Sequence, residues 1–142
     1  MFVGDGVDRT MGAFTTIHKL EQPATNGGTV SFPIIQKILT RGAHGADYFS
    51  MVQRSPQGNF IGGLDFLTIP NYYYCERGDK CNATALYQWD VITHQFTEIA
   101  TIPSSGPGQT DHFTNSNGTF IVIAENFANR LSIYRVNATI EK

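Results

Sequence analysis

Short hydrophobic stretches rich in β-branched and aromatic residues recur along the chain, and clusters of Gly, Asn and Pro separate them. The clearest stretches are GTFIVIAEN, which begins at Gly118, and ALYQWDVIT, which begins at Ala85. Short runs rich in β-branched and aromatic residues are typical of strands, and the intervening clusters are typical of turns. No apolar stretch approaches the roughly 18 residues that a membrane-spanning helix needs. The pattern therefore predicts an all-β chain of short strands.

Two parts of the chain align with each other. Residues 32–49, FPIIQKILTRGAHGADYF, match residues 96–113, FTEIATIPSSGPGQTDHF, without a gap at an offset of 64. Downstream, GNFIGGLDF from Gly58 matches GTFIVIAEN at an offset of 60, and ALYQWD matches SIYRVN at an offset of 47. The fall from 60 to 47 predicts 13 extra residues between the two later blocks of the first copy.

A weaker third copy precedes these two. FTTIHKLE, from Phe14, takes the place of ALYQWD and SIYRVN, and the basic period, set by Tyr87 and Tyr134, is 47 residues. Repeats of this length made of short strands indicate propeller blades rather than helix pairs. We therefore expect tandem four-stranded antiparallel blades, about two to three of them, that form part of a β-propeller. The expected boundaries are one partial propeller over 1–142, with a partial repeat 1–31, a repeat 32–90 that carries a Cys-loop insertion near 67–82, and a repeat 91–142.

A set of two or three blades leaves both end faces uncovered, because each blade buries its apolar faces against its neighbours. Closed propellers have about four to eight blades. We therefore expect the chain to be a segment of a larger ring, or to complete a ring by self-association.

The composition narrows the classes of partner. Of the 142 residues, 41% are hydrophobic and only 15% are charged. Ten Lys and Arg residues against 12 Asp and Glu residues give a net charge of −2, without a run of like charges. This balance argues against nucleic acid and against an anionic membrane as the partner. The N-terminal MFVGDGVDRT lacks the basic and apolar regions of a signal peptide. We expect either an intracellular chain or a piece of a longer one.

The cysteines and the glycosylation sequons favour the second alternative. Cys75 and Cys81 have five residues between them and strand-like sequence on both sides, so the two thiols can close a small disulfide loop across a hairpin. Such a bridge persists only in an oxidising compartment. Asn-x-Ser/Thr sequons stand at Asn82, Asn117 and Asn137. We therefore expect a secreted or cell-surface chain that is a fragment.

The segment between the two cysteines holds an RGD tripeptide, Arg77, Gly78 and Asp79. Integrins bind RGD because the Asp carboxylate completes the coordination of a divalent cation on the receptor, while the Arg guanidinium reaches an acidic cleft. A small disulfide loop lowers the entropy cost of holding the two charges apart. The alternative is a polar hairpin tip, in which Gly and Asp are ordinary turn residues.

Three consecutive tyrosines, Tyr72, Tyr73 and Tyr74, lead into this loop. Successive side chains of a strand point to opposite faces, so we expect at least one ring to face solvent or a partner. Exposed Tyr is common at interfaces. Packing within a blade is the equal alternative.

Candidate catalytic and metal-binding residues are few. Asp47 and Asp111 recur at the same repeat position, each two residues before a Phe. They are candidate metal ligands or acid–base groups, but repetition favours a turn-forming Asp that hydrogen-bonds backbone amides. The four His residues lack metal-ligand spacing, and neither cysteine has a nearby base. We predict no metal, no cofactor and no catalytic residue. The enzyme alternative requires acidic or His side chains that converge near the propeller centre.

The order of these motifs resembles the epilepsy-associated repeat, also called the EAR or EPTP repeat. The clearest match is GTFIVIAENFANRLSIYRVN, from Gly118 to Asn137, and the second is LYQWDVITHQF, from Leu86 to Phe96. The resemblance covers most of residues 15–140. GGLDF, which begins at Gly62, departs from the VAN-like run of the family.

The resemblance has consequences for fold and function. EAR repeats form blades of seven-bladed propellers in leucine-rich glioma-inactivated proteins, in a very large adhesion receptor, and in the thrombospondin-type laminin G domain and EAR repeat protein. The resemblance implies that this chain is part of an extracellular, non-enzymatic propeller that binds other cell-surface or secreted proteins through blade edges and loops.

Overall fold

A computed structural model describes residues 2–4, 13–23, 28–55, 57–72 and 83–137 of the protein. These residues form ten β-strands and no helix. Every pairing between the strands is antiparallel, so the prediction of an all-β chain is confirmed. Within these ranges there is no helix with the length and apolar character needed to cross a bilayer.

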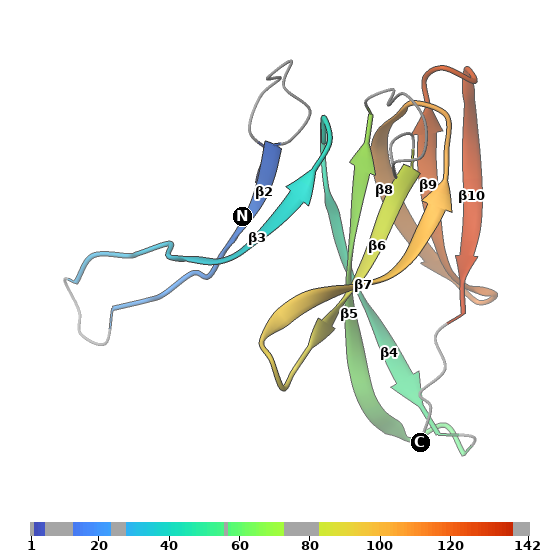
Figure 1. Ribbon diagram of the computed structural model, residues 1–142. Coiled ribbons are helices and arrows are strands. Elements are labelled where there is room, and N and C mark those ends of the chain that lie inside the picture. Colours follow the sequence, from blue (N-terminus) through green and yellow to red (C-terminus); the bar gives the residue numbers. More distant parts are fainter. Residues whose placement is uncertain (1, 5–12, 24–27, 56, 73–82, 138–142) are drawn as a thin grey trace.

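The strands form three sheets that follow one another along the chain (Figure 1). In each sheet, strands that are consecutive in sequence are neighbours, as expected for tandem blades. Sheet 2 has four strands, and sheets 1 and 3 have three each among the described residues. Sheet 1 contains β1 (Phe2–Gly4), β2 (Ala13–His18) and β3 (Ile34–Thr40). Sheet 2 contains β4 (Asp47–Arg54), β5 (Phe60–Asn71), β6 (Ala83–Asp90) and β7 (Gln95–Pro103). Sheet 3 contains β8 (Pro107–Asn115), β9 (Gly118–Glu125) and β10 (Arg130–Val136).

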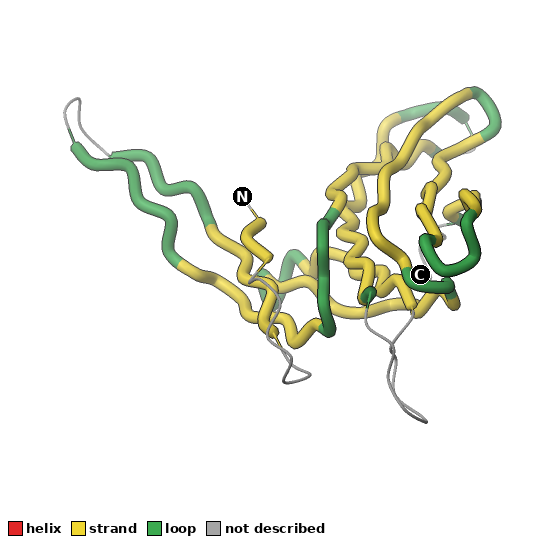
Figure 2. The backbone as a smooth tube through the Cα atoms, turned by 90° about the horizontal axis from the view of Figure 1, so that it is seen from above, coloured by secondary structure: helices red, strands yellow, loops and turns green. Residues whose placement is uncertain are grey.

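A hairpin arm extends from sheet 1 away from the other two sheets (Figure 2). Its described parts, residues 19–23 and 28–33, continue the β2–β3 ladder. The backbone N–H of Lys19 donates to the carbonyl of Pro33 at 3.0 Å, and Glu21 pairs with Ser31. Backbone hydrogen bonds therefore hold the two sides of the arm together beyond the body of sheet 1.

The pairing registers show how the sequence repeat maps onto the sheets. Phe49 pairs with Phe66 in sheet 2, and Phe113 pairs with Phe120 in sheet 3. Because Phe49 and Phe113 are equivalent at the offset of 64, Phe66 is equivalent to Phe120 at an offset of 54. The segment FLTIPN, from Phe66, thus occupies the place of FIVIAE in sheet 3. The alignment of GNFIGGLDF with GTFIVIAEN that the sequence analysis predicts is wrong by six residues.

This register changes where the extra residues of the first copy lie. The offset falls from 64 to 54 across the β4–β5 hairpin, and from 54 to 47 between β5 and β6, where Tyr87 corresponds to Tyr134. Ten residues therefore lengthen the β4–β5 hairpin, and seven lie in the β5–β6 connection that contains the Cys pair. The predicted single insertion of 13 residues is therefore wrong. The Gly-x-Phe at the tip of the β4–β5 hairpin has the same sequence pattern as the Gly-x-Phe that begins β9, but it occupies a different place in the sheet.

An apolar layer joins sheet 1 to sheet 2. Along β2 and β3 the side chains of this layer alternate with ones that face away from sheet 2, whereas along β5 and β6 they alternate with buried side chains that face sheet 3. The Gln36 side chain crosses between the sheets, since its Nε2 donates to the carbonyl of Phe96 and its Oε1 accepts from the Phe96 N–H, both at 2.8 Å. The layer contains Ile17, Ile38, Leu67, Ile69, Ala85, Tyr87 and Phe96.

A second apolar layer joins sheet 2 to sheet 3. Two buried hydroxyls meet inside it, with 2.8 Å between Thr68 Oγ1 and Thr110 Oγ1, so neither is left without a partner. The layer contains Phe49, Phe66, Leu86, Ile121 and Ile123. Sheet 2 is thus covered on both faces, in the way that a central blade would be.

Each of the two connections between sheets is held by a hydrogen bond of the same kind, from a backbone N–H to a side-chain oxygen. After β3, the backbone N–H of Arg41 donates to Oδ1 of Asn71 at 2.9 Å. After β7, the backbone N–H of Ser105 donates to Oε2 of Glu125 at 2.8 Å. These two pairs stand at equivalent positions of the repeat. A polar residue at the end of the second strand of a sheet therefore holds the connection that enters that sheet.

Glu125 is the titratable member of this pair of contacts. Its side chain is 1% exposed and accepts hydrogen bonds from Ser132 Oγ, from Arg130 Nη2 at 3.1 Å and from the Ser105 N–H. These hydrogen bonds, that of Ser132 foremost, hold the pKa of Glu125 below its usual value, although burial acts in the opposite direction. The unfolded chain therefore binds a proton at this carboxylate more readily than the folded chain does.

This difference predicts how stability depends on pH. The contribution of Glu125 is fully present above its unfolded-state pKa of about 4.3 and is lost as the pH falls through the lower folded-state pKa. We expect the free energy of unfolding, measured with urea, to fall as the pH is lowered through this range, and Glu125→Gln to make the fall shallower. Glu21→Gln is the control, because Glu21 forms an exposed ion pair with Lys19. An unchanged pH slope in Glu125→Gln would contradict this assignment.

Candidate functional site

The connections between strands gather at one end of sheets 2 and 3. Figure 1 shows that β3, β5, β7 and β9 all end on this side of the molecule, which is uppermost in that view. The connections here are residues 41–46 between β3 and β4, 104–106 between β7 and β8, and 126–129 between β9 and β10. Tyr72 follows β5 at the same end. We call this side the connection end.

Three aromatic side chains from three different connections meet at the connection end. The rings of His44 and Tyr72 are 4.9 Å apart, edge to face, and those of Tyr72 and Phe127 are 5.2 Å apart. The side chain of Phe127 is 54% exposed, and Tyr72 is half-buried. We call His44, Tyr72 and Phe127 the aromatic cluster. Exposed aromatic groups held by neighbouring rings are typical of protein-binding surfaces.

A cavity of about 370 Å³ opens beside the aromatic cluster. Its walls combine aromatic rings with the amide side chains of Gln109 and Asn126, so it offers both apolar contact and hydrogen-bonding groups. The lining residues are His44, Tyr72, Gly108, Gln109, Ala124 and Asn126. These residues lie in the β3–β4 connection, after β5, in β8, and at or after the end of β9, so this surface exists only where sheets 2 and 3 are packed together.

Backbone hydrogen bonds fix the aromatic cluster in place. The Tyr72 N–H donates to the carbonyl of Gly42 at 3.4 Å, and the Phe127 N–H donates to the carbonyl of Ser105 at 3.2 Å. Gly42 and Gly106, which are equivalent in the repeat, have φ values of 63° and 60°. Glycine adopts this left-handed conformation without the steric cost that other residues incur. The ring of Phe127 lies directly against Gly106.

The structure places one of the six predicted binding residues. Tyr72 belongs to the aromatic cluster, where it contacts other rings and also lines the cavity. Tyr73, Tyr74, Arg77, Gly78 and Asp79 lie outside the described residues, and so do Cys75, Cys81 and the Asn82 sequon. The chain leaves Tyr72 for the Cys-bracketed segment directly from the connection end. His44 and Phe127 carry no local signal that would have marked them, because each lies in a connection and meets Tyr72 only in three dimensions.

The two other sequons are accessible. Asn117 is exposed in the β8–β9 turn, where its N–H donates to Oδ1 of Asn115 at 2.8 Å. Asn137 is exposed directly after β10. Both positions can therefore accept a glycan without displacing a packed side chain.

Asp47, Asp111 and His112 form a second cluster. Nδ1 of His112 lies 2.8 Å from Oδ2 of Asp47, and Oδ1 of Asp111 accepts from the His112 N–H at 2.7 Å. The imidazole stacks on Phe49 with 4.9 Å between ring centroids. Asp47 is the first residue of β4 and Asp111 lies inside β8. The expectation that Asp111 sits in a turn is therefore wrong, because the alternating strand pattern continues through it.

This second cluster joins the first strands of two neighbouring sheets. One ligand atom from each of its three residues lies within 4.8 Å of the others, so the set could hold a divalent cation. A carboxylate that orients an imidazole is also the arrangement that general bases use. The contacts that the structure gives to His112 are those that link sheet 2 to sheet 3. The repeat position of Asp47 and Asp111 marks both aspartates in the sequence, whereas His112 has no metal-ligand spacing that would mark it.

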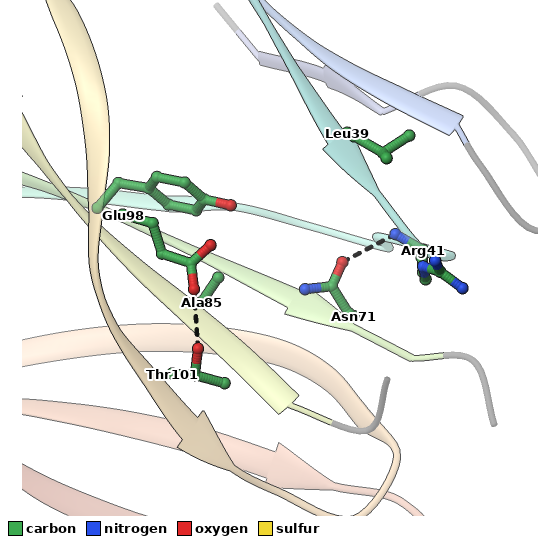
Figure 3. A pocket seen from close by; sticks show the side chains of 7 residues that line it. Leu39, Arg41, Asn71, Ala85, Glu98 and Thr101 are labelled. Atoms are coloured by element: carbon green, nitrogen blue, oxygen red, sulfur yellow. Dashed lines mark hydrogen bonds between the residues drawn. The ribbon is translucent and has the colours of Figure 1, made fainter. Parts of the chain in front are cut away.

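A further cavity, of about 280 Å³, lies where the end of β3 and Arg41 approach β5, β6 and β7 (Figure 3). Glu98 accepts a hydrogen bond from Thr101 Oγ1 at 2.8 Å at its wall, and the Arg41–Asn71 contact closes another side. Burial, together with the nearby carboxylate of Glu98, raises the pKa of Tyr87 to about 12, so its hydroxyl stays protonated at neutral pH. The lining residues are Leu39, Arg41, Asn71, Ala85, Tyr87, Glu98 and Thr101.

Comparison with known proteins gives no match: neither a family model, nor a curated protein, nor a solved structure matches this chain.

Proposed function

We propose that this chain is an extracellular or cell-surface protein-binding module, built from EAR-like propeller blades and without catalytic activity of its own. The aromatic cluster at the connection end is the observation that carries the proposal. Its rings come from the β3–β4, β5–β6 and β9–β10 connections, and Phe127 is 54% exposed although it is large and apolar. A rigid, partly exposed aromatic surface with amide groups at its edge favours a protein partner.

The pairing register supports the resemblance to the EAR repeat. With β5 in register with β9, the segment FLTIPN takes the place of FIVIAE, and GGLDF no longer stands at the position of the VAN-like run. Both copies then carry the same succession of a Phe, alternating hydrophobic residues and a polar residue, Asn71 or Glu125, that accepts a backbone hydrogen bond. A departure from the family pattern remains, because Leu64 stands where Gly118 begins the Gly-x-Phe and the Pro-Asn-Tyr of residues 70–72 stands at the position of the VAN-like run.

An integrin-binding adhesion ligand is the second candidate function. It rests on the sequence alone, in which Arg77, Gly78 and Asp79 stand between Cys75 and Cys81. This alternative predicts that binding requires a divalent cation and the Asp79 carboxylate, and that the aromatic cluster contributes little.

Binding to cell surfaces distinguishes the two proposals. The chain, secreted from mammalian cells and fluorescently labelled, is titrated onto a panel of cell lines that includes integrin-bearing ones, and bound label is read by flow cytometry. We expect saturable binding that Tyr72→Ser and Phe127→Ser each weaken about tenfold, because a buried aromatic contact at an interface is worth about 1–2 kcal/mol. Asp79→Ala and chelation of divalent cations should leave this binding unchanged.

Phe60→Ser is the matched control. Phe60 is 68% exposed at the β4–β5 hairpin, which lies at the opposite end of sheet 2 in Figure 1. Loss of binding in Asp79→Ala with normal binding in Phe127→Ser would replace the proposal with the integrin alternative. Equal binding by all four variants would exclude both surfaces.

A further inference from the structure

The face of sheet 2 that packs on sheet 3 is equivalent, in the repeat, to the face of sheet 3 that points away from sheet 2. In sheet 2, this face carries Phe49, Phe66 and Leu86, which are 2%, 0% and 8% exposed because sheet 3 covers them. The two Phe rings stack with 5.3 Å between centroids. Because this contact removes apolar side chains from water, it stabilises the pairing of the two sheets.

The equivalent residues of sheet 3 are uncovered. Phe113 and Phe120 stack at 5.0 Å in the same way, but Phe113 is 40% exposed. Ile133, at the position of Leu86, is 60% exposed, and Leu131 on the same strand face is 69% exposed. We call Phe113, Phe120, Leu131 and Ile133 the outer face of sheet 3. Contiguous exposed apolar residues of this kind mark an interaction surface.

Sheet 1, at the other end of the described structure, has a free face on the side that points away from sheet 2. Its Ile17 and Ile38 face sheet 2, and the residues that alternate with them point the other way. Phe14 and Leu39 pair with each other on that far side and are 47% and 58% exposed, and Leu39 also lines the cavity beside Arg41. In sheets 2 and 3, the corresponding side is the one that packs on the preceding sheet.

We propose that the chain self-associates head to tail, with the outer face of sheet 3 of one copy packed on the free face of sheet 1 of the next. The occupant follows from the repeat: within one chain, the same two kinds of face already pair twice, sheet 1 with sheet 2 and sheet 2 with sheet 3. A contact between two different surfaces leaves one free face at each end, so copies add on until the assembly closes. The outer face of sheet 3 and the free face of sheet 1 are both separate from the connection end. The proposed self-association therefore does not depend on the proposed partner binding.

Sedimentation velocity of the 142-residue chain tests the proposal, over concentrations from low micromolar to sub-millimolar. We expect the wild-type average mass to rise with concentration. Ile133→Glu blocks the outer face of sheet 3 and Phe14→Glu blocks the free face of sheet 1, so each variant alone should keep the mass of a single chain. An equal mixture of the two variants should form a dimer, because one intact face of each kind remains.

Matched variants and alternative outcomes make the test specific. Ile92→Glu, at an 85% exposed site in the β6–β7 turn, should associate like wild type, and Leu131→Glu repeats the test of sheet 3 if Ile133→Glu unfolds. Tyr72→Ser and Phe127→Ser should associate normally. A wild-type chain that stays monomeric overturns the proposal. So does association of Phe14→Glu alone, which would indicate that two sheet 3 faces pack on each other.

Discussion

Replacing Phe49 by Ala should lower the free energy of unfolding by about 3–5 kcal/mol. The side chain is 2% exposed, stacks on Phe66 and contacts the His112 ring, so its removal leaves a cavity between sheets 2 and 3. Surrounding strands can relax only in part, because the backbone ladders of both sheets hold them. Urea denaturation at a concentration at which the chain is monomeric measures this loss.

Phe113→Ala is the matched control, because Phe113 stands at the same repeat position. Its side chain is 40% exposed and packs on Phe120 alone among the described aromatic rings. We expect a loss of about 1 kcal/mol, since much of the ring already contacts water. Equal losses at the two positions would contradict the structure, in which sheet 3 covers Phe49 and no described sheet covers Phe113.

Gly106→Val should lower the free energy of unfolding by about 2 kcal/mol, because a β-branched residue is strained in the left-handed conformation. The φ of Gly106 is 60°. A Cβ at this position would also lie 2.5 Å from Cδ2 of Phe127, so the ring must leave its place beside Tyr72. We therefore expect weaker cell-surface binding as well as lower stability, measured by flow cytometry and urea denaturation.

Gly45→Val separates these effects from the general cost of replacing glycine in a connection. Gly45 lies in the β3–β4 connection and lacks a left-handed φ, and no atom other than its own and those of its chain neighbours lies within 4 Å of the position of a Cβ. We expect a change within about 0.5 kcal/mol and unchanged binding. Wild-type stability in Gly106→Val would show that the connection does not require the left-handed conformation.

The strands could be predicted from the sequence because β-branched and aromatic runs and the turn clusters between them are local properties. Residues that face the core recur every second position, and short polar connections make consecutive strands neighbours. The register of β5 was not accessible. The Gly-x-Phe at Gly58 and that at Gly118 look alike in sequence, but one is a hairpin tip and the other begins a strand that pairs through Phe120. Only the hydrogen-bonded partners distinguish them.

The candidate sites depend more heavily on tertiary structure. Asp47 and Asp111 were identified by their repeat position, yet the approach of His112 to Asp47 arises from packing β8 beside β4. The aromatic cluster likewise joins residues 28 and 55 positions apart, from His44 to Tyr72 and from Tyr72 to Phe127. No local sequence pattern indicates that residues so far apart along the chain are in contact.

The sequence by itself determined the all-β architecture, the period of the repeat and the identity of the apolar positions, since these depend on neighbours along the chain. Tertiary structure decided which apolar positions are covered. Phe49 and Phe113 have the same repeat position and the same cross-strand Phe partner, but one is 2% and the other 40% exposed. The difference arises because a sheet can bury its outer face only when another sheet is packed on it.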